Sequence, residues 1–328
     1  METRLFNLRI QKWIISVAVL LFAVKMVAYF LTRSVSILTD ALESTVNVIA
    51  GLIGLYSLYV SAKPKDENHP YGHGKAEFIS AAVEGTLIGI AGMIIIYESI
   101  HHLVYPQPLQ QLNYGIALIV FSAVVNFIMG QVAVQYGKKN DSLALIASGK
   151  HLKSDTYSTI GIVAGLVLIY YTGILIIDSI VAMIFGLIII FTGYRITRSS
   201  IAGIMDEADK LLLTRMVALL NSNRRENWVD LHNLRVIKYG SIIHVDCHLT
   251  VPWYFNINQA HIEVEALSQL IRNEFGEAME LFVHSDGCLY SQCSICSKHD
   301  CLVRQHPFEK KIIWTLVNIL SDKKHQLL

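Results

Sequence analysis

Polar side chains interrupt two otherwise apolar stretches of this 328-residue chain. In LTDALESTVNVIAGLIGLYSL, Asp40, Glu43 and Asn47 stand at i, i+3 and i+7, which places them on one face of a helix. In GKHLKSD, His151 and Asp155 share a face at i and i+4. Carboxylate and amide oxygens and imidazole nitrogens bind divalent metals, so two such faces can surround one cation. The alternative, hydrogen bonds that merely join helices, explains their number and matched spacing less well.

A polar loop offers a second set of ligands. DENHPYGHGKAE carries Asp66, His69 and His73, and its glycines permit a sharp turn that would bring the three side chains onto one metal. The alternative is a solvated loop whose histidines bind nothing. We favour a metal site because the loop directly follows the first apolar ligand stretch.

The composition indicates a membrane protein. The chain is 53% hydrophobic and 16% charged, with a mean hydropathy of +0.45, and is more apolar than a soluble domain of this length. A net charge of +1 without a basic face argues against a nucleic-acid partner. Apolar stretches of about 20 residues are long enough to cross a lipid bilayer. Six are predicted as transmembrane helices: Trp13–Leu31, Ile37–Val60, Ala76–Ile100, Tyr114–Tyr136, Leu145–Tyr171 and Ile174–Ile196.

Basic residues predict the orientation of these spans. Lys and Arg gather before the first span, between the second and third, between the fourth and fifth, and after the sixth. The turns on the other side carry only Arg33. By the positive-inside rule both termini are cytoplasmic, and we expect a multi-pass protein of a bacterial inner (plasma) membrane.

The residues after the sixth span are too polar to insert and predict a small α-β-β-α-β domain with its helices on one face of a sheet. Alternation in IIHVDCHLTV places His244 and His248 on a polar face and Cys247 among core residues, and the pattern alone does not make His244 a ligand. KYGS indicates a tight hairpin. The predicted elements are a helix at Met205–Asn221, strands at Leu231–Tyr239 and Ser241–Val251, a helix at Asn258–Phe275 and a strand at Glu280–Val283.

These features together resemble the cation diffusion facilitator family, from Met1 to about Gly287. The resemblance rests on the six spans, the cytoplasmic α-β-β-α-β domain, HPYGHGKAE in an inner loop and His-x-x-x-Asp in the fifth span. It implies a mainly α membrane protein with a ferredoxin-like or metallochaperone-like domain. It also implies a homodimer that exports Zn²⁺ or another divalent metal in exchange for protons.

The resemblance also assigns ligands. It maps the transport site to Glu43, Asn47, His151 and Asp155, and the loop site to Asp66, His69 and His73. In the cytoplasmic domain it implies zinc ligands near the dimer contact at His232, His248, His261, His284 and Asp286.

Two positions depart from the family pattern. Glu43 stands where members usually have His or Asp, and Asn47 where they have Asp. A neutral amide is a poor zinc ligand and lowers the negative charge, which makes Mn²⁺ or Fe²⁺ more plausible. Asp40 is expected either to ligate or to support the ligands. Zn²⁺ stays the first choice, with Mn²⁺, Fe²⁺, Co²⁺ and Cd²⁺ as alternatives.

The same groups can couple metal to protons. The metal-binding form of His151 is neutral, and carboxylates release metal when protonated, so metal and protons compete for one site. Alternating exposure of that site would exchange them across the membrane. The sequence contains neither G-x-x-x-x-G-K-[ST] nor H-E-x-x-H, so we expect a secondary active transporter and not an enzyme. A metal sensor without transport remains an alternative, although it would not need ligands in mid-membrane.

The chain is expected to divide into a membrane domain (1–203), a cytoplasmic domain (204–287) and a cysteine-rich extension (288–328). The spacing C-x₄-C-x₂-C-x₄-C favours a zinc knot on the reducing cytoplasmic side, with His299 and His306 nearby. An iron–sulfur cluster and unligated thiols are the alternatives. A short amphipathic helix from Phe308 to about Leu320 is expected to pack on the domain or its dimer mate. The four thiols are those of Cys288, Cys293, Cys296 and Cys301.

Overall fold

The computed structural model describes residues 2–106, 108–139, 143–239, 242–276 and 279–327, without the side chains of residues 2–12, 58, 137, 139, 143–148 and 151. The chain forms two compact units. The first comprises Met1–Tyr59 and Ile79–Ile201, and the second Val60–Phe78 and Ala202–Leu328. The loop that carries Asp66, His69 and His73 therefore belongs to the second unit.

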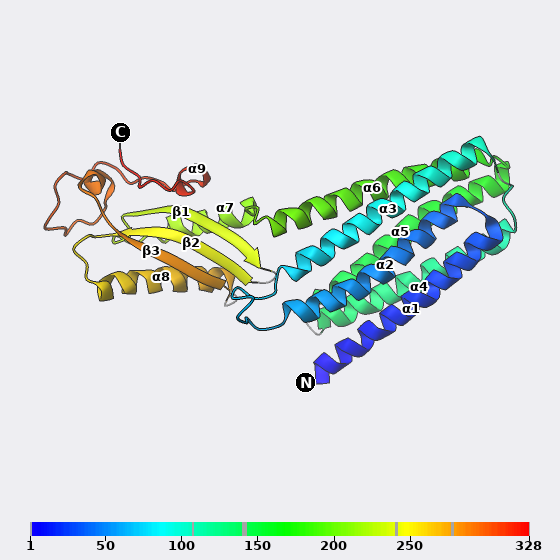
Figure 1. Cartoon of the computed structure of the whole chain (residues 1–328), viewed down its shortest axis with the longest axis horizontal. Coiled ribbons are helices and arrows are strands. Elements are labelled where there is room, and N and C mark those ends of the chain that lie inside the picture. The colour runs from blue at the N-terminus through cyan, green and yellow to red at the C-terminus, as the bar shows by residue number, and fades with distance from the viewer. Residues whose placement is uncertain (1, 107, 140–142, 240–241, 277–278, 328) are drawn as a thin grey trace. The chain divides into compact units, whose positions relative to one another are not determined.

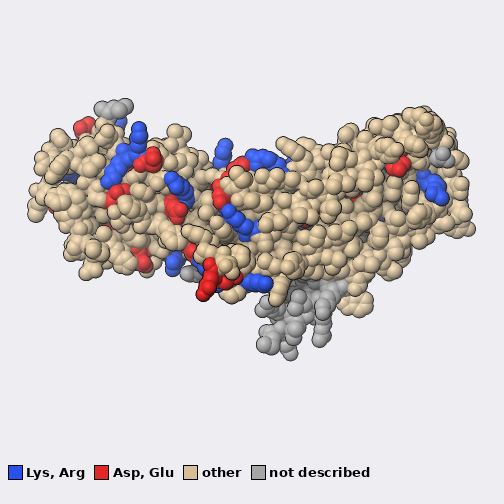
Figure 2. Space-filling model, viewed as in Figure 1, with Lys and Arg blue, Asp and Glu red and all other residues tan. Residues whose placement is uncertain are grey.

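The first unit consists of long apolar helices (Figure 1). Each of the six is long and apolar enough to cross a membrane, which confirms the predicted spans. On the face shown in Figure 2, few charged side chains interrupt the surface over these helices. The helices are α1 (Glu2–Thr32), α2 (Val35–Ser61), α3 (Ala76–Val104), α4 (Leu112–Lys139), α5 (Leu143–Thr172) and α6 (Ile176–Ile204).

Glycines let pairs of these helices approach closely. A Cβ atom on Gly193 of α6 would lie 2.7 Å from the main-chain oxygen of Gly85 in α3. A Cβ atom on Gly149 of α5 would lie 2.6 Å from the oxygen of Gly130 in α4. Within a bilayer, where apolar burial no longer drives association, such close backbone contacts stabilise helix pairs.

A buried carboxylate fixes the start of α2. Asp178, in the first turn of α6, accepts hydrogen bonds from Ser34 Oγ (2.7 Å), the main-chain N–H of Val35 (2.7 Å) and that of Ser36 (3.3 Å). These donors include N–H groups that the first helical turn leaves unpaired, so Asp178 acts as an N-terminal cap supplied by another helix. The helix that carries Asp40, Glu43 and Asn47 is thereby held at one end.

The second unit contains the predicted α-β-β-α-β order (Figure 1). The sheet order is β1-β2-β3, with β2 antiparallel to β1 and parallel to β3. The predicted turn in KYGS falls on residues 240–241, which lie outside the described residues. The elements are α7 (Lys210–Ser222), β1 (Asp230–Tyr239), β2 (Ile242–Val251), α8 (Ile257–Phe275), β3 (Met279–Gly287), the 3₁₀ helix η1 (Tyr290–Ile295) and α9 (Leu316–Ile319).

One face of this sheet builds the core. Val245, Cys247 and Leu249 of β2 belong to one buried cluster with Met216 of α7 and Leu267 of α8. Burial raises the pKa of the Cys247 thiol to about 12, so this cysteine is a core residue, as predicted. The opposite face carries the histidines of the three strands. His244 on that face is only 3% exposed and is covered rather than solvated.

The predicted helix from Phe308 to about Leu320 is wrong, because only Leu316–Ile319 is helical. Trp314 enters the core, and its main chain pairs with Asn221 through N–H···Oδ1 (3.0 Å) and Nδ2–H···O (2.7 Å) bonds. Arg224 lies 4.1 Å from the centroid of the Trp314 indole and donates to the Ile312 oxygen at 2.7 Å. These side chains satisfy backbone groups that a helix would have paired internally. The segment nevertheless packs on the domain, as predicted.

Candidate metal sites

Glu43 and Asn47 of α2 and Asp155 of α5 line one cavity of about 280 Å³ in the first unit. Asn47 Nδ2 donates a hydrogen bond to Asp155 Oδ2 at 3.0 Å, which joins the two helices directly. The backbone of His151 lies in α5, one turn before Asp155, and its side chain lies outside the described residues. Three of the four predicted transport ligands therefore face a common space.

Asn47 and Asp155 also line a second cavity of about 160 Å³. Its other lining residues include Ser44 and Asn126, while most of its wall is apolar. The pair Asn47 and Asp155 thus stands between two hollows of the helix bundle.

Sequence reasoning missed Glu84 of α3. This carboxylate lines the larger cavity together with Glu43 and Asp155, and Ser158 of α5 contributes a hydroxyl. The sequence does indicate this residue, because Glu84 is a charged residue within the apolar stretch of α3, just as Asp40 is within that of α2. The cavity is therefore more acidic than α2 and α5 alone would make it.

Asp40 lines neither of these cavities and lies in a buried hydrogen-bond network beside them. Lys25 Nζ of α1 donates to Asp40 Oδ1 at 2.9 Å, and both side chains are 1% exposed. The Thr159 hydroxyl of α5 lies 2.9 Å from the same oxygen, and Ser44 Oγ accepts from Lys25 at 2.8 Å. Asp40 is thus engaged by a lysine that sequence analysis did not associate with it.

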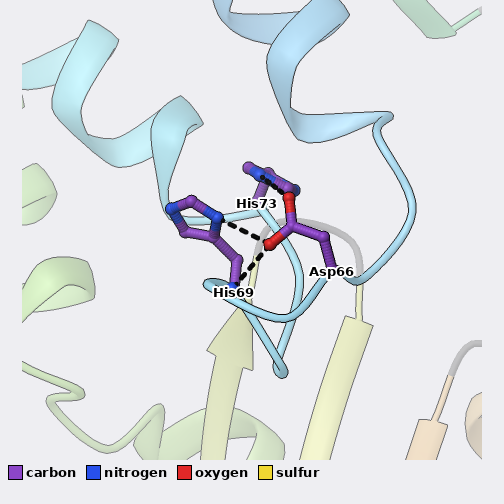
Figure 3. A group of neighbouring side chains, drawn as sticks. All are labelled: Asp66, His69 and His73. Carbon is purple, nitrogen blue, oxygen red and sulfur yellow. Dashed lines mark hydrogen bonds and ion pairs between the residues drawn. The ribbon is translucent and has the colours of Figure 1, made fainter.

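The loop residues Asp66, His69 and His73 come together as predicted by their spacing (Figure 3). Asp66 Oδ1 lies 2.9 Å from His69 Nδ1, and Asp66 Oδ2 lies 3.4 Å from His73 Nε2. The main-chain N–H of His69 also donates to Asp66 Oδ1 at 2.7 Å, and Gly72 adopts φ 91° in the turn. Hydrogen bonding from His69 lowers the pKa of Asp66, so the carboxylate is ionised and available to a cation.

This loop is packed against the rest of the second unit. Lys75 Nζ lies 2.8 Å from Asp206 Oδ2 and 4.6 Å from the centroid of the Tyr239 ring. Tyr71 contacts the rings of Tyr239 and His244, which explains why His244 is buried. Burial alone would lower the pKa of Lys75, but the hydrogen bond to Asp206 raises it, so the lysine stays charged. The loop that carries the candidate ligands therefore packs against β1 and β2 through Tyr71 and Lys75.

The three strands align a row of histidines. His232 of β1, His248 of β2 and His284 of β3 are register partners across the sheet. Ligand atoms of His232, His248 and Asp286 all lie within 4.8 Å of one another. Asp286 Oδ2 is 3.1 Å from His248 Nδ1 and 3.6 Å from His232 Nε2, and Asp286 Oδ1 is 3.6 Å from His284 Nδ1. Burial lowers the pKa of His232, which favours the neutral, metal-binding imidazole.

The end of the chain covers this cluster. Lys324 Nζ lies 3.3 Å from Asp286 Oδ1 and donates to the Gly287 oxygen at 2.9 Å. Asn233, at a β1 bulge with φ 52°, donates its N–H to the Ser321 oxygen at 2.7 Å. Burial would raise the pKa of Asp286, but the Lys324 ammonium and the His248 hydrogen bond lower it. In this structure a lysine neutralises the carboxylate that a metal would bind.

The remaining predicted ligands do not reach this spacing, although the Cys288 thiol is near enough to those of Cys293, Cys296 and Cys301 to interact with them electrostatically. Among the described side chains, groups of three or more His, Cys, Asp and Glu ligand atoms within 4.8 Å of one another occur at two places. These are the loop cluster (Asp66, His69 and His73) and the strand cluster (His232, His248 and Asp286). His261 lies exposed on α8 and belongs to neither. Cys288, Cys293, Cys296 and Cys301 are free thiols outside both groups.

Comparison with known proteins finds matches to both parts of the chain. The profile of the cation efflux transmembrane domain matches residues 12–205, and that of the cation efflux protein cytoplasmic domain matches residues 208–288. An uncharacterized transporter of Synechocystis is 32% identical over 257 residues, which cover 78% of this chain and 83% of that protein. A cation-efflux pump named FieF from Cronobacter sakazakii is 28% identical, and the match covers 83% of this chain and 90% of that protein. The FieF pump of Citrobacter koseri is 27% identical, and the match covers 83% of this chain and 89% of that protein. The chain therefore belongs to the cation diffusion facilitator family of membrane-embedded cation-efflux transporters.

Proposed function

We propose that this transporter exports Zn²⁺ from the cytoplasm across a bacterial inner membrane in exchange for protons, as a homodimer with both termini in the cytoplasm. The observation that carries the transport site is the shared cavity of Glu43, Asn47 and Asp155, built by α2 and α5 within the membrane-spanning unit. FieF relatives are named cation-efflux pumps, which supports the direction of transport.

The ligand chemistry fits a largely dehydrated divalent ion. Glu43 and Asp155 offer carboxylate oxygens, and His151 of α5 is proposed to supply an imidazole. Asn47 now points its Nδ2 at Asp155, so its amide must turn to offer oxygen to a metal. An amide oxygen suits Mn²⁺ and Fe²⁺ better than zinc, and these ions are the alternative cargo, followed by Co²⁺ and Cd²⁺.

Competition between metal and protons supplies the coupling. Asp155 and Glu43 bind metal as carboxylates and release it when protonated, and His151 binds it only when neutral. Asn47 and Asp155 line both cavities, so small movements of α2 and α5 are proposed to open the site to one side or the other.

The other clusters are proposed as accessory sites. Asp66, His69 and His73 would bind metal in the loop, and His232, His248 and Asp286 in the domain, with His284 beside them. His261 is proposed to act near a dimer contact. We retain the zinc knot of the four cysteines as a proposal, and it requires the thiols to move closer together.

The test is metal flux into proteoliposomes with an imposed pH gradient, run with Zn²⁺, Mn²⁺, Fe²⁺, Co²⁺ and Cd²⁺. We expect Asp155→Ala to abolish flux. Asp300→Ala, which removes a carboxylate that is 76% exposed, serves as the matched control and should transport normally. Flux that persists in Asp155→Ala contradicts the assigned site, and metal binding without flux in the native chain indicates a sensor.

A further inference from the structure

A fully buried lysine stands beside the proposed transport site. Lys25 lies within the apolar span of α1 and is 1% exposed. A charged lysine in the centre of a membrane helix is costly unless a partner stabilises it. Its partner is Asp40 Oδ1 at 2.9 Å, and Ser44 Oγ accepts a second hydrogen bond at 2.8 Å.

The other surroundings of Asp40 leave part of its charge unsatisfied. The Thr159 hydroxyl lies 2.9 Å from Asp40 Oδ1 and 2.9 Å from the main-chain oxygen of Asp155. Asp40 Oδ2 is buried and has no hydrogen-bond partner among the described residues. The ammonium of Lys25 is therefore the main compensation for this carboxylate.

The pair is next to the groups proposed to bind the cation. Ser44, which accepts from Lys25, lines the smaller cavity with Asn47 and Asp155. Asp40 precedes Glu43 by three residues on α2, and Thr159 follows Asp155 by four on α5. A change in charge at Lys25 or Asp40 is consequently felt by an ion in the site, because charges in a low-dielectric interior are weakly screened.

We propose that Lys25 is a resident cation that sets the charge of the transport site. Its ammonium cancels the charge of Asp40, so the transported ion meets the acidic groups of the cavity, Glu43, Glu84 and Asp155, without the added attraction of Asp40. Lys25 positions charge and does not touch the metal. Without it the site would hold a divalent ion too tightly to release it quickly.

This inference rests on the proposed transport site, and its signature is a pair of opposite effects. Lys25→Met leaves Asp40 without a cationic partner, so Zn²⁺ and Mn²⁺ should bind about tenfold or more tightly and turn over more slowly. Asp40→Asn leaves an unpaired ammonium, so affinity should fall by about tenfold or more. The double variant Lys25→Met, Asp40→Asn should return to near the native affinity. A merely structural pair would lower stability in both single variants without opposite changes in affinity.

Two readouts keep the two proposals distinguishable. The first is metal binding that depends on Asp155, measured with the full chain in detergent as the difference from the matching Asp155→Ala protein. The second is the half-saturating metal concentration and maximal rate of flux in proteoliposomes. Absence of flux in the native chain would refute transport, whereas Asp155-dependent binding would still test Lys25.

Lys138→Met is the matched control, because it removes the same charge from an exposed lysine at the end of α4. It should leave affinity and flux unchanged. Affinity shifts of the same sign in the two single variants, or a double variant unlike the native chain, would overturn the proposal. Should Lys25→Met fail to fold, Asp40→Asn and the double variant decide the question, since the first must bind weakly and the second must not.

Discussion

Two regions of this transporter place a lysine ammonium against a carboxylate, and they do so in different ways. Lys25 and Asp40 are each 1% exposed and join two long helices. Lys324 and Asp286 are 24% and 17% exposed, and the lysine comes from the segment after the last strand. In the strand cluster the carboxylate is itself a proposed ligand, whereas Asp40 is only a neighbour of the proposed ligands Glu43 and Asp155.

The difference in burial means that one lysine is a permanent partner of its carboxylate, whereas the other can be displaced. Breaking a sealed pair leaves a charge in a medium that cannot solvate it, so Lys25 is expected to stay on Asp40 throughout the transport cycle. Water can replace Lys324 at low cost, and a divalent ion competes with it directly for Asp286. We therefore interpret Lys324 as a placeholder, that is, a cation that occupies the Asp286 carboxylate until a metal displaces it. Lys25 is by contrast a permanent part of the site.

The largest expected effect is on stability. Lys25→Met should lower the free energy of unfolding by about 3–5 kcal/mol, because it strands the buried Asp40 carboxylate. Lys324→Met breaks a partly exposed pair and should cost no more than about 1 kcal/mol. Reversible unfolding of both variants in detergent checks the contrast. Equal losses would mean that the two pairs do not differ as their burial indicates.

A smaller effect concerns the ligands themselves. The strand cluster offers two imidazoles and one carboxylate, while the proposed membrane ligands whose side chains are described, Glu43, Asn47 and Asp155, would offer oxygen atoms. Asn47→Asp should raise the preference for Zn²⁺ over Mn²⁺ in flux by about tenfold, since a carboxylate replaces a neutral amide. The ratio of half-saturating concentrations for the two metals measures this. Asn126→Asp, which adds a carboxylate to the smaller cavity alone, is the control for added charge.

Each region also shows how far the sequence alone predicts structure. Spacing along one helix placed Glu43 with Asn47, and spacing within one short loop placed Asp66 with His69, because those relations depend only on local geometry. The partner of Asp40 is fifteen residues away on another helix, and no periodicity connects Lys25 to it. Glu84 likewise reached the cavity only through packing of α3.

The end of the chain was the least predictable part. The amphipathic pattern from Phe308 to about Leu320 predicts a helix, but Trp314 lies within it and its burial outweighs that pattern. Asn221 and Arg224 then satisfy the local backbone, and they are about ninety residues earlier in the chain. The contact of Lys324 with Asp286 joins the final segment to β3 and likewise had no local signal.

Removing the placeholder should strengthen metal binding to the strand cluster. Lys324→Ala should raise Zn²⁺ affinity about threefold to fivefold, the range expected for a partly exposed ion pair. The affinity is measured as the binding component lost in His248→Ala. Lys323→Ala is the matched control, because Lys323 is exposed and adjacent. An unchanged affinity in Lys324→Ala would mean that the lysine does not compete with metal.

The smallest expected effect is a pH dependence in how residues 321–327, the segment that carries Lys324, dock on the strand cluster. His325 Nδ1 lies 2.5 Å from Asp230 Oδ1, and this hydrogen bond raises the pKa of His325. The His325–Asp230 pair therefore contributes its full stabilisation to the docked segment below pH 6.5, the ordinary pKa of histidine. That contribution is lost as the pH rises through the raised pKa of His325. Burial would raise the pKa of Asp230, but the hydrogen bonds from His325 lower it below its ordinary value of 3.8. On the acidic side, the pair is therefore lost only as the pH falls through this lowered pKa of Asp230. The segment should therefore dock best near pH 5–6 and loosen above neutrality.

Hydrogen exchange of residues 321–327, corrected for intrinsic rates, measures this loosening. Protection should fall severalfold between pH 6 and pH 8.5 in the native chain, and His325→Asn should remove most of that dependence. His299→Asn, at an exposed histidine of the same extension, should keep it. If protection is instead constant with pH, the Lys324 placeholder is held by the Ser321 and Gly287 main-chain contacts alone. The strand cluster would then be covered equally well at every pH, and only metal itself could uncover Asp286.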